Sequence, residues 1–353
     1  MGKVKEFLKK KDIVISGKRY GIEAMSAMAQ GLFASLLIGT ILDTLGKQLG
    51  VEILCTVGAF ASGVKGPAMA VAIAYALHCP TLVMFSLAAV GAAADSLGGA
   101  GGPLAVLLIS IVSAELGKLV SKETRLDILV TPLVTIGSGV LLSMACAPAI
   151  GTAALAVGEA IRWAMIQQPF LMGILVSVVI GICLTLPISS AAICISIGLT
   201  GLAGGAAVAG CCAQMVGFAV MSFRENGWGG LAAQGLGTSM LQMGNIVKNP
   251  RIWIPPTLAS AVTGPLASCL FHLEMNGSAV ASGMGTCGLV GQIGVYSGWV
   301  NDVAAGIKPG ITAWDWIGLI LISFVLPAVL TWLFALPLRK CGWIREGDLK
   351  LDL

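Results

Sequence analysis

The chain has 353 residues, of which 57% are hydrophobic and only 11% charged, and its formal net charge is +4. Soluble domains carry about 25% charged residues, so this composition, with a mean hydropathy of +0.93, excludes an ordinary water-soluble domain. The apolar runs are about 20 residues long and continuous rather than alternating. They exclude a transmembrane barrel and predict an all-α, polytopic membrane protein.

Residues 1–20 form a basic segment in which apolar side chains separate the cations. Its apolar part is too short for a signal peptide, and the pattern predicts an amphipathic segment on the membrane surface, attracted to anionic lipid. Residues 339–353 form a second basic group. Because cations near span ends favour the cytoplasm, we expect both ends there, with residues 21–338 as the membrane-embedded transport domain.

Eight apolar runs have the length that a helix needs to cross a bilayer. They lie at about 24–46, 68–92, 101–120, 126–147, 169–187, 203–222, 251–273 and 311–337. Shorter or interrupted apolar stretches lie near 51–64, 148–166, 188–202, 229–247 and 278–298. Irregular backbone is allowed at membrane depth where it lines a cavity, so we expect about 8–10 spans plus re-entrant hairpins.

The stretch 51–67 is one of these short segments, and it ends in Lys65-Gly66-Pro67. A lone cation in a short apolar hairpin is unusual. Lys65 either binds an anionic or phosphorylated solute or extends its ammonium group to the interface, and it is therefore a candidate binding residue.

The stretch 226–250 carries Gln234, Thr238, Gln242 and Asn245 at spacings of three or four residues. On a regular helix these side chains would share one face. Such a stripe either lines an aqueous path or forms hydrogen bonds between spans, and the sequence leaves both readings open.

The stretch 271–297 is the richest in polar side chains at membrane depth, where such residues are costly and often functional. Its polar members are His272, Glu274, Asn276, Ser278, Ser282, Thr286 and Gln292. Six glycines between 277 and 294 weaken a long helix, so we expect a helical hairpin with a polar tip that binds a solute. The alternative is an interfacial loop with His272 and Glu274 in water.

Several common site motifs are missing from the sequence. There is no G-x-x-x-x-G-K-[ST] phosphate-binding loop and no C-x-x-C pair among the ten cysteines. We therefore expect no ATP-driven transport by this chain, no metal or cofactor and no nucleic-acid partner. No paired acid–base or nucleophile arrangement identifies a catalytic residue.

Three motifs carry a resemblance to a known family. They are N-P-R-I-W-I-P-P-T (249–257), G-P-L-A-S (264–268) and G-M-G-T-C-G-L-V-G-Q-I (283–293). From about residue 15 to 340 the chain resembles the second EIIC-type, perfringolysin-regulator-like membrane family of the bacterial phosphotransferase system. The resemblance implies a sugar-permease fold, often homodimeric, with a substrate carboxylate on a re-entrant hairpin. Glu274 and Asn276 match the polar tip, and 283–293 matches the glycine-rich arm.

The sequence also departs from that pattern. It has no companion EIIB-like domain and no glutamate-containing tetrapeptide of the glucose-type permeases. The chain is thus at most the membrane subunit of a sugar phosphotransferase, and a separate EIIB-type protein would supply the phosphoryl group.

We therefore expect a permease in the bacterial inner membrane that moves a sugar or related polar solute by alternating access. Glu274, Asn276 and His272 would hold hydroxyl groups, and the secondary lining would comprise Gln242, Asn245, Thr286 and Gln292. The alternatives are a solute sensor or regulator without net transport, and an ion-coupled permease for a non-sugar solute.

Overall fold

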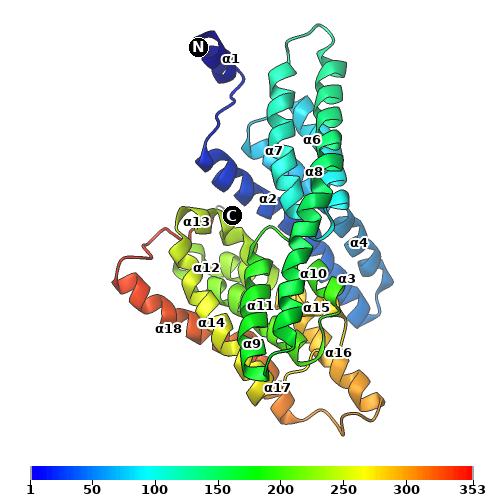
Figure 1. Cartoon of the computed structure of the whole chain (residues 1–353), viewed down its shortest axis with the longest axis vertical. Helices are drawn as coiled ribbons and strands as arrows, with labels where there is room; N and C mark the ends of the chain where they lie inside the picture. Colours follow the sequence, from blue (N-terminus) through cyan, green and yellow to red (C-terminus); the bar gives the residue numbers. More distant parts are fainter. Residues whose placement is uncertain (1, 352–353) are drawn as a thin grey trace. The chain divides into compact units, whose positions relative to one another are not determined.

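The computed structural model describes residues 2–351, with side chains from residue 6 onward. Within that range the chain is helical and contains no β-strand, only one isolated antiparallel bridge between Gly201 and Met275. The helices form two compact units, Met1–Ala153 and Ala154–Leu353. Figure 1 shows the helices in chain order, and the described part confirms the predicted all-α fold.

The first unit is built from the N-terminal helices. They are α1 (Gly2–Lys10), α2 (Ala24–Leu32), α3 (Ile38–Leu49), α4 (Glu52–Gly63), α5 (Lys65–Ala76), α6 (Thr81–Gly98), α7 (Gly102–Val120) and the first part of α8 (Asp127–Met165). Helix α5 packs against α2 and α6, and α6 packs against α7. Close approach of α5 and α6 depends on Gly66 and Gly91, since a Cβ on Gly91 would lie 2.3 Å from the Gly66 carbonyl oxygen.

The second unit holds the rest of α8 and the remaining helices. They are α9 (Pro169–Thr185), α10 (Ser190–Ile197), α11 (Gly201–Met221), α12 (Phe223–Ala232), α13 (Met243–Lys248), α14 (Ile254–Pro265), α15 (Ala279–Ser282), α16 (Val290–Ala304), α17 (Ala313–Ile320) and α18 (Leu326–Lys340). Helix α11 is its centre and contacts α9, α14 and α18.

Small side chains explain why α11 can be surrounded in this way. Its most apolar stretch is 94% buried. A Cβ on Gly210 would lie 1.9 Å from the Ser177 carbonyl oxygen of α9, and one on Gly217 would lie 2.5 Å from Thr331 Oγ1 of α18. Membrane helices associate through such close backbone packing, because apolar side chains gain little by leaving lipid for a helix interface.

In the described part of the chain, five helical stretches are long and apolar enough to cross a membrane. They are Arg19–Leu49, Thr81–Val120, Asp127–Met165, Gly201–Met221 and Ala313–Lys340. Helices α4 and α5, bent by 49° at Val64, form a sixth stretch that is a broken span or a re-entrant loop. The stretch Thr81–Val120 contains α6 and α7, which pack on each other across a turn at Gly99–Gly101. Each of these two helices has nearly the length of one crossing.

Two predicted span boundaries are wrong. The break expected between 147 and 148 is missing, because Pro148 and Pro132 are both accommodated inside the continuous helix α8. The run 68–92 is interrupted instead, since α5 ends at Ala76 and α6 begins at Thr81. His78 has a positive φ of 54°, and the Pro80 ring favours a first helical turn over continuation of a preceding helix.

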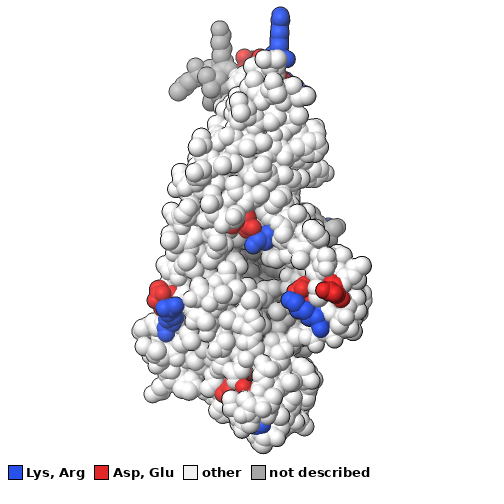
Figure 2. Space-filling view, turned by 90° about the vertical axis from the view of Figure 1, so that its right-hand side faces the viewer, with Lys and Arg blue, Asp and Glu red and all other residues white. Residues whose placement is uncertain are grey.

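The surface is apolar to an extent that suits lipid. Figure 2 shows a face on which Lys, Arg, Asp and Glu form only a few isolated groups amid uncharged surface. Large exposed side chains include Phe60, Ile128 and Leu133, which are 77%, 71% and 75% exposed. Such extensive exposed apolar surface marks contact with a membrane or a partner, in agreement with the predicted polytopic membrane protein.

Candidate functional site

An extended segment, residues 273–276, follows His272, lies between α11 and α16 and carries the predicted polar tip. Met275 pairs with Gly201 at the start of α11 through two backbone hydrogen bonds of 3.0 Å. Side chains alternate along such backbone, and here Leu273 and Met275 are buried, whereas Glu274 and Asn276 are only half-buried. The apolar residues therefore anchor the segment and leave the polar ones available.

Glycines on both neighbouring helices make room for this segment. A Cβ on Gly205 of α11 would lie 1.6 Å from the Leu273 carbonyl oxygen. On the other side, a Cβ on Gly298 of α16 would lie 2.8 Å from the Asn276 backbone nitrogen. The glycine-rich sequence on either side of the tip thus serves close backbone packing.

Asn276 joins two carboxylates. Its amide nitrogen Nδ2 donates to Glu274 Oε2 at 3.0 Å and to Asp302 Oδ2, on α16, at 2.8 Å. Both amide protons are then used, so the Glu274–Asn276–Asp302 cluster has a fixed geometry. Neither carboxylate forms an ion pair with any residue that the structure describes.

The Glu274–Asn276–Asp302 cluster has three acceptors to spare. Glu274 Oε1, Asp302 Oδ1 and Asn276 Oδ1 accept no hydrogen bond within the described part of the chain. Carboxylate oxygens accept stronger hydrogen bonds than neutral oxygens do. The cluster can therefore bind a ligand that offers several hydroxyl or other neutral donors in a small volume.

Sequence reasoning missed Asp302. Only the return of α16 toward the extended segment brings it to Asn276, and no motif spacing encodes that return. One signal was available, because Asp302 is the first carboxylate after Glu274 in the chain.

The remaining predicted residues of this stretch lie in other hydrogen-bond sets. His272 is exposed, with a φ of 44°. Thr286 is buried and donates to the Gly235 carbonyl oxygen. Gln292 donates to Ser323 Oγ at 2.9 Å and contacts Cys212 Sγ at 3.3 Å. Neither Thr286 nor Gln292 hydrogen-bonds to the Glu274–Asn276–Asp302 cluster in the described structure.

Gln242 and Asn245 belong to an amide network with Gln234 that binds the C-terminal segment. Gln242 Nε2 donates to Gln234 Oε1 and to the Leu349 carbonyl oxygen, both at 2.9 Å. Asn245 Nδ2 donates to Gln242 Oε1 and to the Lys350 carbonyl oxygen, again at 2.9 Å. All three side chains are buried.

The predicted single helical face of this stretch is wrong. Thr238 is extended, with φ −156° and ψ 143°, so it separates a π-helical turn, Ala233–Gly237, from a 3-10 turn, Ser239–Gln242. Gln234 and Gln242 nevertheless meet through the hydrogen bond from Gln242 Nε2 to Gln234 Oε1. Of the two readings of this stripe, hydrogen bonding within the protein therefore describes Gln242 and Asn245. Their backbone partners lie in the C-terminal segment rather than in another span.

Lys65 lies in the first unit and is not a lone cation. Its ammonium nitrogen is 3.4 Å from Asp95 Oδ1, and the Asp95 side chain is 13% exposed. This ion pair joins α5 to α6 and offsets part of the cost of placing charges among apolar helices. The glycines around Asp95 had indicated a turn in the sequence instead.

A sequence model of one family, described as Phosphotransferase system, EIIC, matches residues 22–351. The chain belongs to this family. It is a multi-pass membrane permease of the phosphotransferase system for sugar transport, and the predicted resemblance is confirmed. No curated protein matched the chain, and no solved structure matched it.

Proposed function

We propose that the Glu274–Asn276–Asp302 cluster is the sugar-binding centre of this EIIC permease. The observation that carries the proposal is the pair of carboxylates joined by one amide. Among the described residues, three of the cluster's acceptors are free and no cation pairs with either carboxylate. Sugar hydroxyls are donors, and several of them can bond to these oxygens together. In this proposal His272, which is exposed and two residues before Glu274, holds a further sugar hydroxyl.

Asn276 has a positioning role in this proposal. It holds the carboxylates close together, and each then presents its second oxygen to the ligand. Thr286 and Gln292 order the glycine-rich arm through their internal hydrogen bonds. Gln242 and Asn245 hold the C-terminal segment in place rather than lining the path of the sugar.

We further propose transport by alternating access, as in other carriers whose sites lie on broken helices. A separate EIIB-type protein supplies the phosphoryl group, since no residue of the cluster is a phosphoryl donor. The protein acts as a homodimer in the bacterial inner membrane, with both ends in the cytoplasm. The basic segments at the two ends favour that orientation.

The test is ligand protection of the detergent-purified protein against thermal unfolding, with a panel of sugars, polyols, nucleosides and organic acids. A ligand that binds only the folded state stabilises it by about 2.7 kcal/mol at a concentration of 100 Kd. We expect a sugar to protect the wild type, and Glu274→Gln and Asp302→Asn to weaken its binding at least tenfold. Loss of one charge-assisted hydrogen bond accounts for a change of that size.

Glu159→Gln is the matched control, because Glu159 is a 72% exposed carboxylate paired with Arg162 on the surface. It should bind the sugar as the wild type does. Unchanged sugar binding in both cluster variants would refute the proposed centre. Protection by organic acids alone would favour the ion-coupled alternative, and a sugar that binds without uptake into vesicles containing the phosphoryl donor would favour a sensor.

A further inference from the structure

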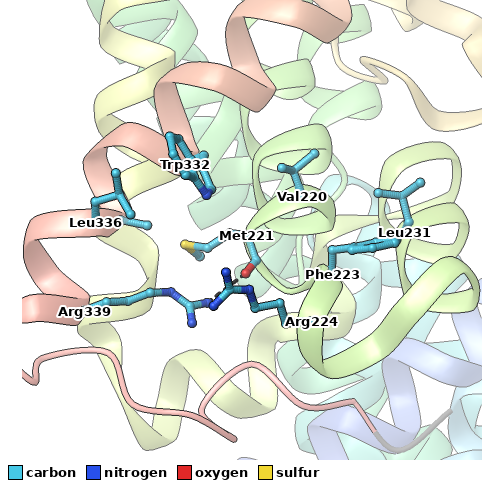
Figure 3. Close-up of a pocket in the computed structure, with 9 residues that line it drawn as sticks. Val220, Met221, Phe223, Arg224, Leu231, Trp332, Leu336 and Arg339 are labelled. Carbon is cyan, nitrogen blue, oxygen red and sulfur yellow. Dashed lines mark hydrogen bonds between the residues drawn. The ribbon is translucent and has the colours of Figure 1, made fainter.

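A cavity lies in the second unit, where α11, α12 and α18 meet. It has a volume of about 300 Å³. Its lining is Val220, Met221, Phe223, Arg224, Leu231, Trp332, Ala335, Leu336 and Arg339. Figure 3 shows the apolar side chains along its walls and the two arginines at one end.

The charged end carries more positive than negative charge. Arg339 Nη2 donates to the Met221 carbonyl oxygen at 2.8 Å and is 4.0 Å from Glu225 Oε1. Arg224 is exposed and forms no hydrogen bond or ion pair with the residues that the structure describes. In Figure 3 the two guanidinium groups point toward one another. Two like charges in this arrangement favour an anion between them.

The cavity lies at a level that fits the membrane–water interface. Met221 is the last residue of α11 and Arg339 is the penultimate residue of α18, and both helices belong to stretches able to cross a membrane. Phe223 packs edge-on against Trp228, which is 76% exposed, at a centroid distance of 5.1 Å. Trp332 is 51% exposed. Tryptophan and basic residues gather at this depth of a bilayer.

We propose that this cavity binds one anionic phospholipid, with its phosphate between Arg224 and Arg339 and an acyl chain along Trp332, Leu336 and Phe223. Guanidinium groups bind phosphate oxygens through paired hydrogen bonds. The apolar walls match the lipid chain, which a free phosphate lacks, and the exposed Arg224 supplies the charge that Glu225 does not offset. This lipid site is separate from the proposed sugar-binding centre and does not depend on it.

The experiment uses the full-length protein in detergent, to which phosphatidylglycerol or phosphatidylcholine with identical acyl chains is added. Bound lipid is counted by native mass spectrometry, and protection is followed by thermal unfolding. We expect one tightly retained phosphatidylglycerol, bound at least tenfold more tightly than phosphatidylcholine. Arg224→Gln should abolish that preference by weakening phosphatidylglycerol binding about tenfold. Trp332→Ala should weaken both lipids alike.

Lys340→Gln is the matched control, since Lys340 is an exposed cation next to Arg339 that does not line the cavity. It should leave the preference unchanged. Equal binding of the two lipids by the wild type, or an equal loss in Lys340→Gln and Arg224→Gln, would overturn the proposal. Protection by inorganic phosphate or glycerol phosphate equal to that by phosphatidylglycerol would also overturn it, because the acyl chain would then contribute nothing.

Discussion

Two polar regions of the second unit contain the residues expected to line one path, yet they bond in opposite ways. In the amide network, the donors of Gln242 and Asn245 bind other amides and the C-terminal backbone. In the Glu274–Asn276–Asp302 cluster, one amide serves two carboxylates, and three oxygens accept no bond from the described residues. We call the first the closed region, and the second, which keeps three unused acceptors among the described residues, the open region.

The difference follows from the chemistry of the side chains. An amide both donates and accepts, so neighbouring amides can satisfy one another, whereas an ionised carboxylate only accepts. Two carboxylates beside a single amide therefore need further donors, which a sugar can bring. A polar stripe in a membrane sequence indicates a binding site only when its side chains offer more acceptors than donors, or more donors than acceptors, so that some are left for a ligand.

The largest expected effect comes from filling the space at Gly205 of α11 against which the extended segment packs. In Gly205→Ala the new methyl group would lie 1.6 Å from the Leu273 carbonyl oxygen, so backbone must move. We expect a loss of more than about 3 kcal/mol in the free energy of unfolding, above the usual cost of overpacking, together with loss of sugar binding. Gly229→Ala, on α12 with no atom within 4 Å of the new methyl, is the control and should change stability by less than about 1 kcal/mol.

That result is measured by thermal and denaturant unfolding in detergent. A Gly205→Ala protein as stable as Gly229→Ala would show that the extended segment does not pack directly on Gly205 of α11.

Asn276→Leu tests the open region directly. The substitution keeps the side-chain size but leaves two facing carboxylates without their common donor. We expect sugar affinity to fall at least tenfold and the free energy of unfolding to fall by about 1–3 kcal/mol. Asn301→Leu, at an exposed position next to Asp302, should change neither. The measurement is a sugar titration of both variants. Wild-type sugar affinity in Asn276→Leu would refute the bridging role of Asn276.

The sequence could predict more of the fold than of the site, for physical reasons. Long apolar runs determine spanning helices, and the motifs within 249–293 predicted the family correctly. The meeting of Glu274 with Asp302, and of Lys65 with Asp95, depends on how helices return through space, which local patterns do not encode. The helix break at Thr238 could not be predicted from the sequence either, because a spacing of three or four residues fits several kinds of helical turn.

Gln242→Leu tests the closed region, and its effect should appear in stability alone. It removes the donor to the Leu349 carbonyl oxygen and the acceptor of Asn245 Nδ2. Leaving buried polar groups unpaired costs about 1–3 kcal/mol, so we expect lower stability and faster proteolysis of the C-terminal segment, with unchanged sugar affinity. Gln168→Leu, at an exposed position before α9, is the control. A tenfold loss of sugar affinity in Gln242→Leu would place the amide network in the sugar site after all.

The smallest expected effect concerns pH and the same C-terminal segment. Glu225 accepts a hydrogen bond from the Leu349 backbone nitrogen at 2.8 Å, and burial raises the pKa of its carboxyl above the ordinary 4.5. The folded protein therefore binds this proton more tightly than the unfolded chain does. The resulting stabilisation is present below about pH 4.5 and is lost as the pH rises through the raised pKa.

Glu225→Gln should remove this pH-dependent stabilisation from unfolding curves measured between about pH 4 and 7. Glu346→Gln, at an exposed position of the same segment, is the control and should retain it. Identical pH profiles for wild type and Glu225→Gln would mean that folding does not raise the pKa of the Glu225 carboxyl. Water would then reach this end of the closed region.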